Sequence, residues 1–137
     1  MKCVIVITIV SFVAYVQCLN LEQRDLLLKR KEFCMEITKV DPSLVRKLSR
    51  TNFRDKDSPL GRFVHCLLVQ SDLMSNEGIL KFDVFLNKIP GEDKDLMERL
   101  MMTCMNRGTF HRLEDRAVLL YKCFKAIYPD KVHTLFL

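Results

Sequence analysis

Residues 114–128 read EDRAVLLYKCFKAIY, and this stretch decides the fold of the chain. After its first two acids, only Arg116, Lys122 and Lys125 interrupt a run of apolar side chains. A helix that is apolar almost all round is usually buried in the middle of a bundle. Pro129 follows and stops the helix, because proline cannot continue the hydrogen-bond pattern. We therefore expect a central helix from Glu114 to Tyr128.

The same stretch contains one of six cysteines, and four of the six belong to the expected domain. Cys34, Cys66, Cys104 and Cys123 are separated by 31, 37 and 18 residues, whereas Cys3 and Cys18 lie in an N-terminal leader. Four widely spaced cysteines in a small secreted chain favour two disulfides that pin helices together. Four cysteines allow three pairings, and spacing alone does not choose among them. Structural zinc sites use close pairs such as CxxC, which the chain lacks, so we expect no metal.

The leader, residues 1–18, reads MKCVIVITIVSFVAYVQC and indicates secretion. Lys2 precedes an apolar run that ends near Val16, and small residues at Val16 and Cys18 suit cleavage after Cys18. An uncleaved membrane anchor is the alternative, but the run is shorter than the ~20 residues that a span needs. We expect a signal peptide at 1–18 and one extracellular domain at 19–137, with no second long apolar stretch.

Apolar periodicity and N-cap residues predict further helices in the rest of the chain. Apolar residues Leu26, Phe33 and Ile37 form a stripe within a helix expected from Leu21 to Thr38. Asp41-Pro42 and Ser58-Pro59 both combine an N-cap with proline at the first helical position. They predict one helix to Leu48 and another through Phe63, Cys66, Leu67 and Gln70.

Two further helices are expected between these and the central one. A turn at Asn76-Glu77-Gly78 precedes a helix from Lys81 to Ile89 with Phe82, Phe85 and Leu86 on one face. Pro90-Gly91 ends that helix, and the next one runs from Glu92 to Arg107, with Gly108 as its terminator. Its apolar stripe consists of Met97, Leu100, Met101 and Cys104. Thr51–Asp57 is a polar loop, and no strand-like alternation persists, so the fold class is all-α.

The sequence shows no catalytic arrangement. His65 precedes Cys66, but neighbouring helical residues point in different directions and a disulfide-bonded cysteine is no nucleophile. Asp93 and Asp95 fall in the first turn of a helix, where carboxylates stabilise the helix dipole. The formal charge of +5 is spread along the chain without a dense basic cluster, which argues against nucleic-acid binding. We expect neither an enzyme nor a cofactor.

At this point the chain resembles the insect pheromone-binding and general odorant-binding family. Members have a signal peptide, about six helices and six cysteines. Cys34, Cys66, Cys104 and Cys123 match the first, third, fourth and sixth of these. Arg62 and Glu114 stand where the second and fifth cysteines would be, so both partners of one bridge are missing. The pattern is similar to the four-cysteine "minus-C" subgroup. Two segments also resemble sequences of this family: CLLVQSDLMSNEGILKFDVFL and LMERLMMTCMNR.

The resemblance implies a structure and a role. It implies the pairs Cys34–Cys66 and Cys104–Cys123 in a compact bundle of about six helices that encloses an apolar cavity. The missing bridge implies looser packing between the helices at 58–73 and 114–128. The implied role is a secreted carrier of small hydrophobic molecules, and Met and Phe side chains suit adaptable pocket walls. Pattern and family together suggest as wall residues Leu48, Phe53, Leu68, Met74, Phe85, Met97, Met101, Leu120, Phe124 and Phe136.

Several questions about partners and release stay open from sequence. A monomer or weak homodimer is expected, with a membrane chemoreceptor as a possible partner in delivery. His133 lies beside the apolar tail and could make ligand release depend on pH. The alternative function is a secreted helical interaction protein, cytokine-like or saposin-like, which would carry a broad exposed apolar face.

Overall fold

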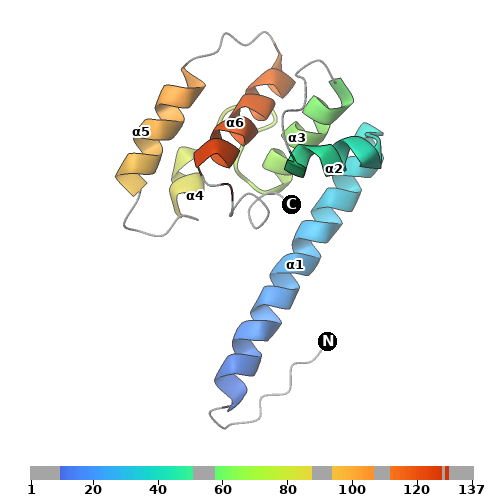
Figure 1. Ribbon diagram of the computed structural model, residues 1–137, viewed down its shortest axis with the longest axis vertical. Helices are drawn as coiled ribbons and strands as arrows, with labels where there is room; N and C mark the ends of the chain where they lie inside the picture. The colour runs from blue at the N-terminus through green and yellow to red at the C-terminus, as the bar shows by residue number, and fades with distance from the viewer. Residues whose placement is uncertain (1–9, 51–57, 88–93, 107–111, 128, 130–137) are drawn as a thin grey trace.

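The computed structural model describes residues 10–50, 58–87, 94–106, 112–127 and 129 (Figure 1). Six helices lie in this part of the chain, and no strand does, apart from one isolated bridge between Met74 and Leu80. The all-α prediction is therefore confirmed. The helices are α1 (Val10–Thr38), α2 (Pro42–Arg50), α3 (Ser58–Gln70), α4 (Phe82–Asn87), α5 (Lys94–Met105) and α6 (Leu113–Ile127).

Helix α6 is central, as its sequence predicts, and begins one residue before the expected Glu114. It lies between α5 on one side and α3 on the other, and packs extensively against both (Figure 1). The burial follows from its apolar surface, which the two flanking helices remove from water. Its buried side chains are Ala117, Val118, Leu120, Tyr121, Cys123 and Phe124.

Each of the two disulfides joins a pair of helices, α1 to α3 and α5 to α6. Cys34 of α1 bonds to Cys66 of α3, with their Cα atoms 5.7 Å apart. Cys104 of α5 bonds to Cys123 of α6, with a Cα separation of 6.0 Å. Both separations are ordinary for disulfides, and the pairing that the resemblance implies is confirmed.

Asp41 caps the N-terminus of α2, as the sequence predicts. The Asp41 carboxylate accepts a 2.7 Å hydrogen bond from the backbone N–H of Ser43, which lowers the pKa of Asp41. The Asp41 carbonyl accepts the first helical bond, from the N–H of Leu44 at 2.9 Å. A cap followed by proline thus begins α2 where expected, and the helix ends two residues beyond the expected Leu48.

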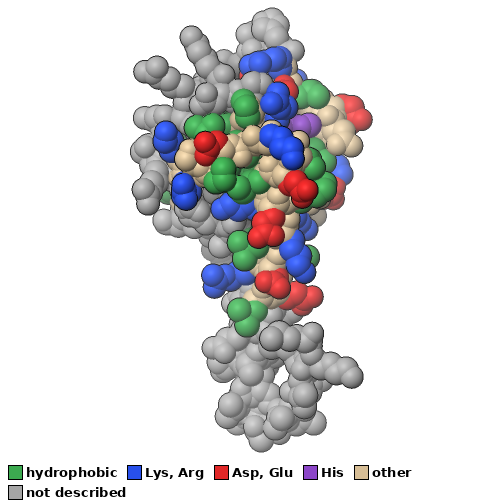
Figure 2. Space-filling model, turned by 90° about the vertical axis from the view of Figure 1, so that its right-hand side faces the viewer, with side chains coloured by type: hydrophobic (Ala, Val, Ile, Leu, Met, Phe, Trp, Pro, Cys, Tyr) green, Lys and Arg blue, Asp and Glu red, His purple; other side chains and the backbone are tan. Residues whose placement is uncertain are grey.

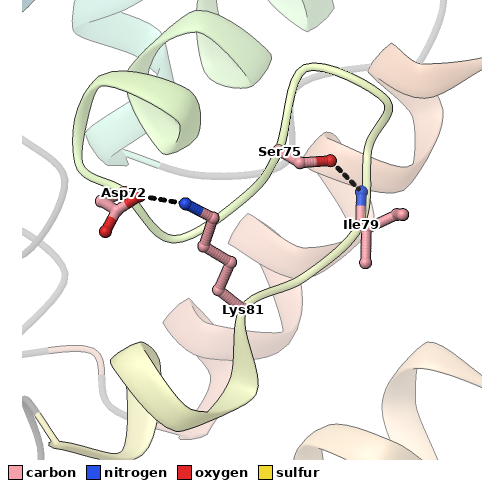
Figure 3. Close-up of polar contacts among 4 residues, drawn as sticks. All are labelled: Asp72, Ser75, Ile79 and Lys81. Carbon is pink, nitrogen blue, oxygen red and sulfur yellow. Dashed lines mark hydrogen bonds and ion pairs between the residues drawn. The ribbon is translucent and has the colours of Figure 1, made fainter.

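The connection from α3 to α4 is held by its own polar groups (Figure 3). Lys81 pairs with Asp72, and the Ser75 hydroxyl accepts the N–H of Ile79 at 3.2 Å. Gly78 completes the predicted turn with a φ of 79°, a conformation that glycine adopts freely. A Cβ at this position would lie 2.8 Å from Leu113 Cδ2, so glycine also lets the turn pack against α6.

Helix α1 differs most from its prediction. It already includes Val10, well before the expected start at Leu21, and it is continuous to Thr38 because no glycine or proline interrupts this part of the chain. The apolar stripe of Leu26, Phe33 and Ile37 is 46–55% exposed, so this stripe does not face the bundle. The helix meets the bundle near its C-terminal end and projects away from it along the rest of its length (Figure 1). No helix within the described ranges has both the length and the apolarity to cross a membrane.

In the shorter helices α4 and α5, the buried faces agree with the predictions except at one position, although α4 begins one residue after the expected Lys81 and α5 ends two residues before the expected Arg107. In α5, Met97 and Met101 are buried and Cys104 is half-buried, but Leu100 is exposed, because its place on the helix turns it away from the bundle. In α4, Phe85 is buried and the flanking Phe82 and Leu86 pack against the core. Predictions for the loop Thr51–Asp57, for Pro90-Gly91 and for Gly108 lie outside the described residues.

A candidate apolar binding site in the helical core

The structure brings eight of the ten predicted wall residues into one buried cluster. Each is at most 1% exposed, although they come from five helices and one loop. The remaining two, Phe53 and Phe136, lie outside the described residues. The eight are Leu48 from α2, Leu68 from α3, Met74 from the following loop, Phe85 from α4, Met97 and Met101 from α5, and Leu120 and Phe124 from α6.

An aromatic pair lies across this cluster. The rings of Phe85 and Phe124 have centroids 5.5 Å apart and meet edge to face at 83°. This arrangement brings the positive edge of one ring to the negative face of the other. Met97 and Met101, one turn apart on α5, add flexible thioether side chains to the same cluster. The interior is therefore apolar, polarisable and able to adjust its shape.

Two polar groups at the edge of the cluster were not predicted as site residues. The Tyr121 hydroxyl donates a 3.4 Å hydrogen bond to the backbone carbonyl of Leu48, and the Lys125 ammonium donates one of 3.0 Å to the same oxygen. Burial raises the pKa of Tyr121 to about 12, so its hydroxyl stays neutral and remains a donor at physiological pH. The only signal in the sequence is their four-residue spacing on an otherwise apolar helix.

Other buried residues also complete the cluster without having been predicted. Phe63 and Leu60 of α3 and Leu73 of the next loop are all buried as deeply as the predicted residues. Phe63 lies one turn before Leu67 on the buried face of α3, so the helical periodicity could have identified it.

The pair His65-Cys66, considered above as a nucleophilic motif, does not form a catalytic pair. Cys66 is in a disulfide, so His65-Cys66 holds no thiol nucleophile. The Nε2 atom of His65 is buried and has no hydrogen-bond partner within the described ranges. No group of three or more His, Cys, Asp or Glu side chains there could hold a metal ion.

The seam between α3 and α6, where a bridge was expected to be missing, is tightly closed. A Cβ at Gly61 would lie only 3.0 Å from the Glu114 Cβ, and these two helices form the most extensive helix pair of the bundle. The expected looser packing is therefore not observed, because glycine lets the two backbones approach. Gly61 rather than the exposed Arg62 faces Glu114 here.

Among residues 21–38 of α1, whose side chains the structure describes, the exposed apolar residues do not form one broad face. Leu26, Phe33 and Ile37 share one side of the helix, whereas Leu21 and Leu28 lie on the other side: Leu28 is two residues, or about 200°, beyond Leu26, and Leu21 is seven residues before Leu28. Figure 2 shows apolar side chains on this helix interspersed with acidic and basic ones. This distribution does not favour the cytokine-like or saposin-like alternative, which needs a continuous apolar surface.

Comparison with known proteins gives one informative match. The model of the PBP/GOBP family matches residues 17–126, which include five of the six helices completely or nearly so and all four bridged cysteines. The comparison with curated proteins found no match.

Proposed function

Because the chain belongs to the PBP/GOBP family of insect odorant- and pheromone-binding proteins, we propose that it carries a small hydrophobic molecule inside its helical core. Proteins of this family are small binding carriers rather than enzymes. The proposal adds to the family assignment an internal cavity lined by the eight buried residues named above, with Phe53 and Phe136 as further wall candidates.

The observation that supports this site most strongly is the convergence of residues from separate elements. Leu48, Met74, Met101 and Phe124 are far apart in sequence, yet all belong to one core with at most 1% exposure. An apolar ligand that enters such an interior gains about 25 cal/mol for each Å² of apolar surface that leaves water. No chemical step is needed for a carrier of this kind.

We also propose that the carrier is extracellular. The leader at 1–18 would be removed, and the domain at 19–137 would fold with its two disulfides in an oxidising compartment. The family model supports this division because its match begins at residue 17, close to the expected cleavage site. Delivery to a membrane chemoreceptor and release controlled by His133 stay predictions, since the tail lies outside the described residues.

The binding proposal is tested with a fluorescent apolar probe, such as N-phenyl-1-naphthylamine, displaced by small lipophilic molecules. Met101 and Met102 provide a matched pair, because Met101 is fully buried and Met102 is 45% exposed. If Met101 lines a cavity, Met101→Trp should fill it and weaken probe binding at least tenfold while the protein stays folded. Met102→Trp should bind as the parent does.

Two outcomes would contradict the proposal. The first is a folded parent protein that binds no apolar probe or ligand. The second is a probe affinity that stays at the parent value in folded Met101→Trp or, if overpacking unfolds that variant, in the smaller change Met101→Phe.

A further inference from the structure

One side of helix α1 combines an apolar stripe with an ordered series of charges. Leu26 and Phe33 lie seven residues apart on this side, and each is 46% exposed. Along one edge of the stripe lie three exposed charges that also recur every seven residues: Glu22, Lys29 and Glu36. Seven residues make almost two helical turns, so these charges follow the stripe along the helix. A narrow apolar seam with charges along its edge is what a helix presents to one partner helix.

The order of the charges indicates how such a partner helix would run. In a parallel pair of identical helices, each residue lies level with its own copy, so Lys29 would lie level with a second Lys29. In an antiparallel pair, an acid of the second copy can lie level with Lys29 instead. Opposite charges across a helix pair favour an orientation, and like charges oppose it. The alternation of acid, base and acid therefore favours an antiparallel second copy of this chain.

We propose that the exposed stripe of α1 binds the same stripe of a second copy of the chain, antiparallel, with the two Leu26 side chains at the two-fold axis. Glu22 and Lys29 then lie about 5 Å on either side of this axis, so each Glu22 is level with Lys29 of the second copy. A two-fold contact repeats every interaction, which gives two equivalent ion pairs. Phe33 of each copy packs toward the start of the other helix. The inference is independent of the carrier proposal.

The position of the bundle on α1 agrees with this register. Cys34 ties α1 to α3, so the bundle lies on the C-terminal side of Leu26 (Figure 1). In an antiparallel pair centred at Leu26, the two Cys34 positions lie about 26 Å apart along the helix axis. The two bundles then lie toward opposite ends of the pair, whereas a pair centred at Phe33 would bring them level. The register that the charges favour therefore also keeps the bundles apart.

The contact between the two copies is small, so we expect weak association. Leu26 and Phe33 supply most of the apolar surface, and each exposed ion pair contributes little. Stable complexes bury roughly 1,200–2,000 Å² in total, and smaller contacts are typical of transient ones. The dimer should therefore form only at high protein concentration.

Sedimentation equilibrium of the disulfide-bonded protein, from about 10 µM to about 1 mM, tests the proposal over the range of weak association. The weight-average mass should rise toward twice the monomer value. Leu26 and Leu28 provide a matched pair, because they are 46% and 50% exposed and lie about 200° apart on the helix. Leu26→Asp should weaken association about tenfold or more, and Leu28→Asp should leave it within about twofold of the parent. Circular dichroism checks that both variants fold, and Leu26→Ser replaces Leu26→Asp if that variant does not.

Reversal of the charges tests the antiparallel register. Glu22→Lys or Lys29→Glu alone places like charges level with each other and should weaken association about threefold or more. The double variant Glu22→Lys/Lys29→Glu exchanges the two signs and keeps both ion pairs, so its affinity should return to within about twofold of the parent. In a parallel pair each residue meets its own copy, so neither single change would have this effect.

Several results would overturn the pairing. They are a protein that stays monomeric up to about 1 mM, an equal loss in Leu26→Asp and Leu28→Asp, or a double charge variant that associates no better than the single ones. If a monomeric protein instead binds vesicles of phosphatidylcholine and phosphatidylserine, and Leu26→Asp prevents this, the stripe docks on a membrane and the second copy is the wrong occupant. Binding of the apolar probe should be unchanged in Leu26→Asp, because this side chain lies outside the core, so the carrier proposal is tested separately.

Discussion

Helices α1 and α6 are both long and rich in apolar residues, but the bundle holds them in different ways. Six side chains of α6 are buried, including Leu120 and Phe124 at 0% exposure. In α1, among residues 21–38, only Cys34 is fully buried, and five large apolar side chains are exposed. Packing secures α6 on several sides, whereas α1 depends on one face against α3 and one disulfide.

The difference shows that apolar content does not decide burial by itself. A helix loses apolar surface to the core only where another element covers it. α6 has neighbours on both sides, and α1 has α3 near one end. Four sets of variants test this contrast between the buried helix α6 and the partly exposed helix α1.

The strongest test truncates one phenylalanine in each helix. Phe124→Ala should lower the free energy of unfolding by about 3–5 kcal/mol, because it opens a cavity in a fully buried site. Phe33, which is 46% exposed, should lose less than about 1 kcal/mol on the same change. Urea denaturation of both variants measures the difference. Similar losses would show that α1 is held by packing as well.

Removing the disulfides should have the next largest effect. Cys34→Ser/Cys66→Ser opens a loop with a sequence separation of 32, which the chain-entropy model values at about 3–4 kcal/mol. The control, Cys104→Ser/Cys123→Ser, opens a shorter loop and should cost about 3 kcal/mol. Only the first pair should speed hydrogen exchange at residues 30–38 far more than in the rest of the bundle. Unchanged exchange there would mean that the disulfide does not anchor α1.

A new disulfide at the α3–α6 seam should have a smaller, stabilising effect. The approach of Gly61 to Glu114 places the two Cβ positions 3.0 Å apart, slightly closer than the ~3.8 Å typical of disulfides. Gly61→Cys/Glu114→Cys should form a bridge after a small shift and add about 1–2 kcal/mol. Arg62→Cys/Glu114→Cys is the control suggested by the family spacing. Peptide mapping under non-reducing conditions identifies the bridges, and a bridge in the control alone would contradict the observed facing residue.

The smallest effect concerns the joint between α1 and α2. The Ser43 N–H lowers the pKa of Asp41 in the folded protein, so the ionised carboxylate stabilises the fold. This stabilisation is present above the ordinary pKa of 3.8 and is lost as the pH falls through the lower folded value. The melting temperature from about pH 6 to about pH 2 should therefore fall slightly more in the parent than in Asp41→Asn. Parallel curves would exclude a contribution from this cap.

The sequence predicted the features that depend on local chemistry. The apolar run of α6, the cap at Asp41 and the turn at Gly78 are set by neighbouring residues, and all appear where expected. The exposure of the α1 stripe was not predicted, because periodicity indicates which side of a helix is apolar and cannot indicate whether a partner covers it. Phe33 and Ile37 have the right spacing for a buried face, yet their side chains are 46% and 55% exposed.

In the candidate site, too, local patterns predicted some residues, while others depend on how the helices pack. Met97 and Met101 follow from the apolar stripe of α5. Leu100 is exposed because it lies at the edge of that stripe, about 60° around the helix from Met97 on the side away from Met101. The meeting of Tyr121 and Lys125 at Leu48 joins residues 73 and 77 positions apart. Such a contact depends on how α2 and α6 pack, and no local pattern encodes it.

The two disulfides close separate, consecutive loops of the chain. The first loop closes at Cys66 before the second opens at Cys104, so the two loops neither overlap nor enclose one another. Each can oxidise without waiting for the other half of the chain to be synthesised. A protease cut at any bond between these loops would produce two separate polypeptides. The close contact of α3 with α6 would then have to keep the halves together without any covalent link.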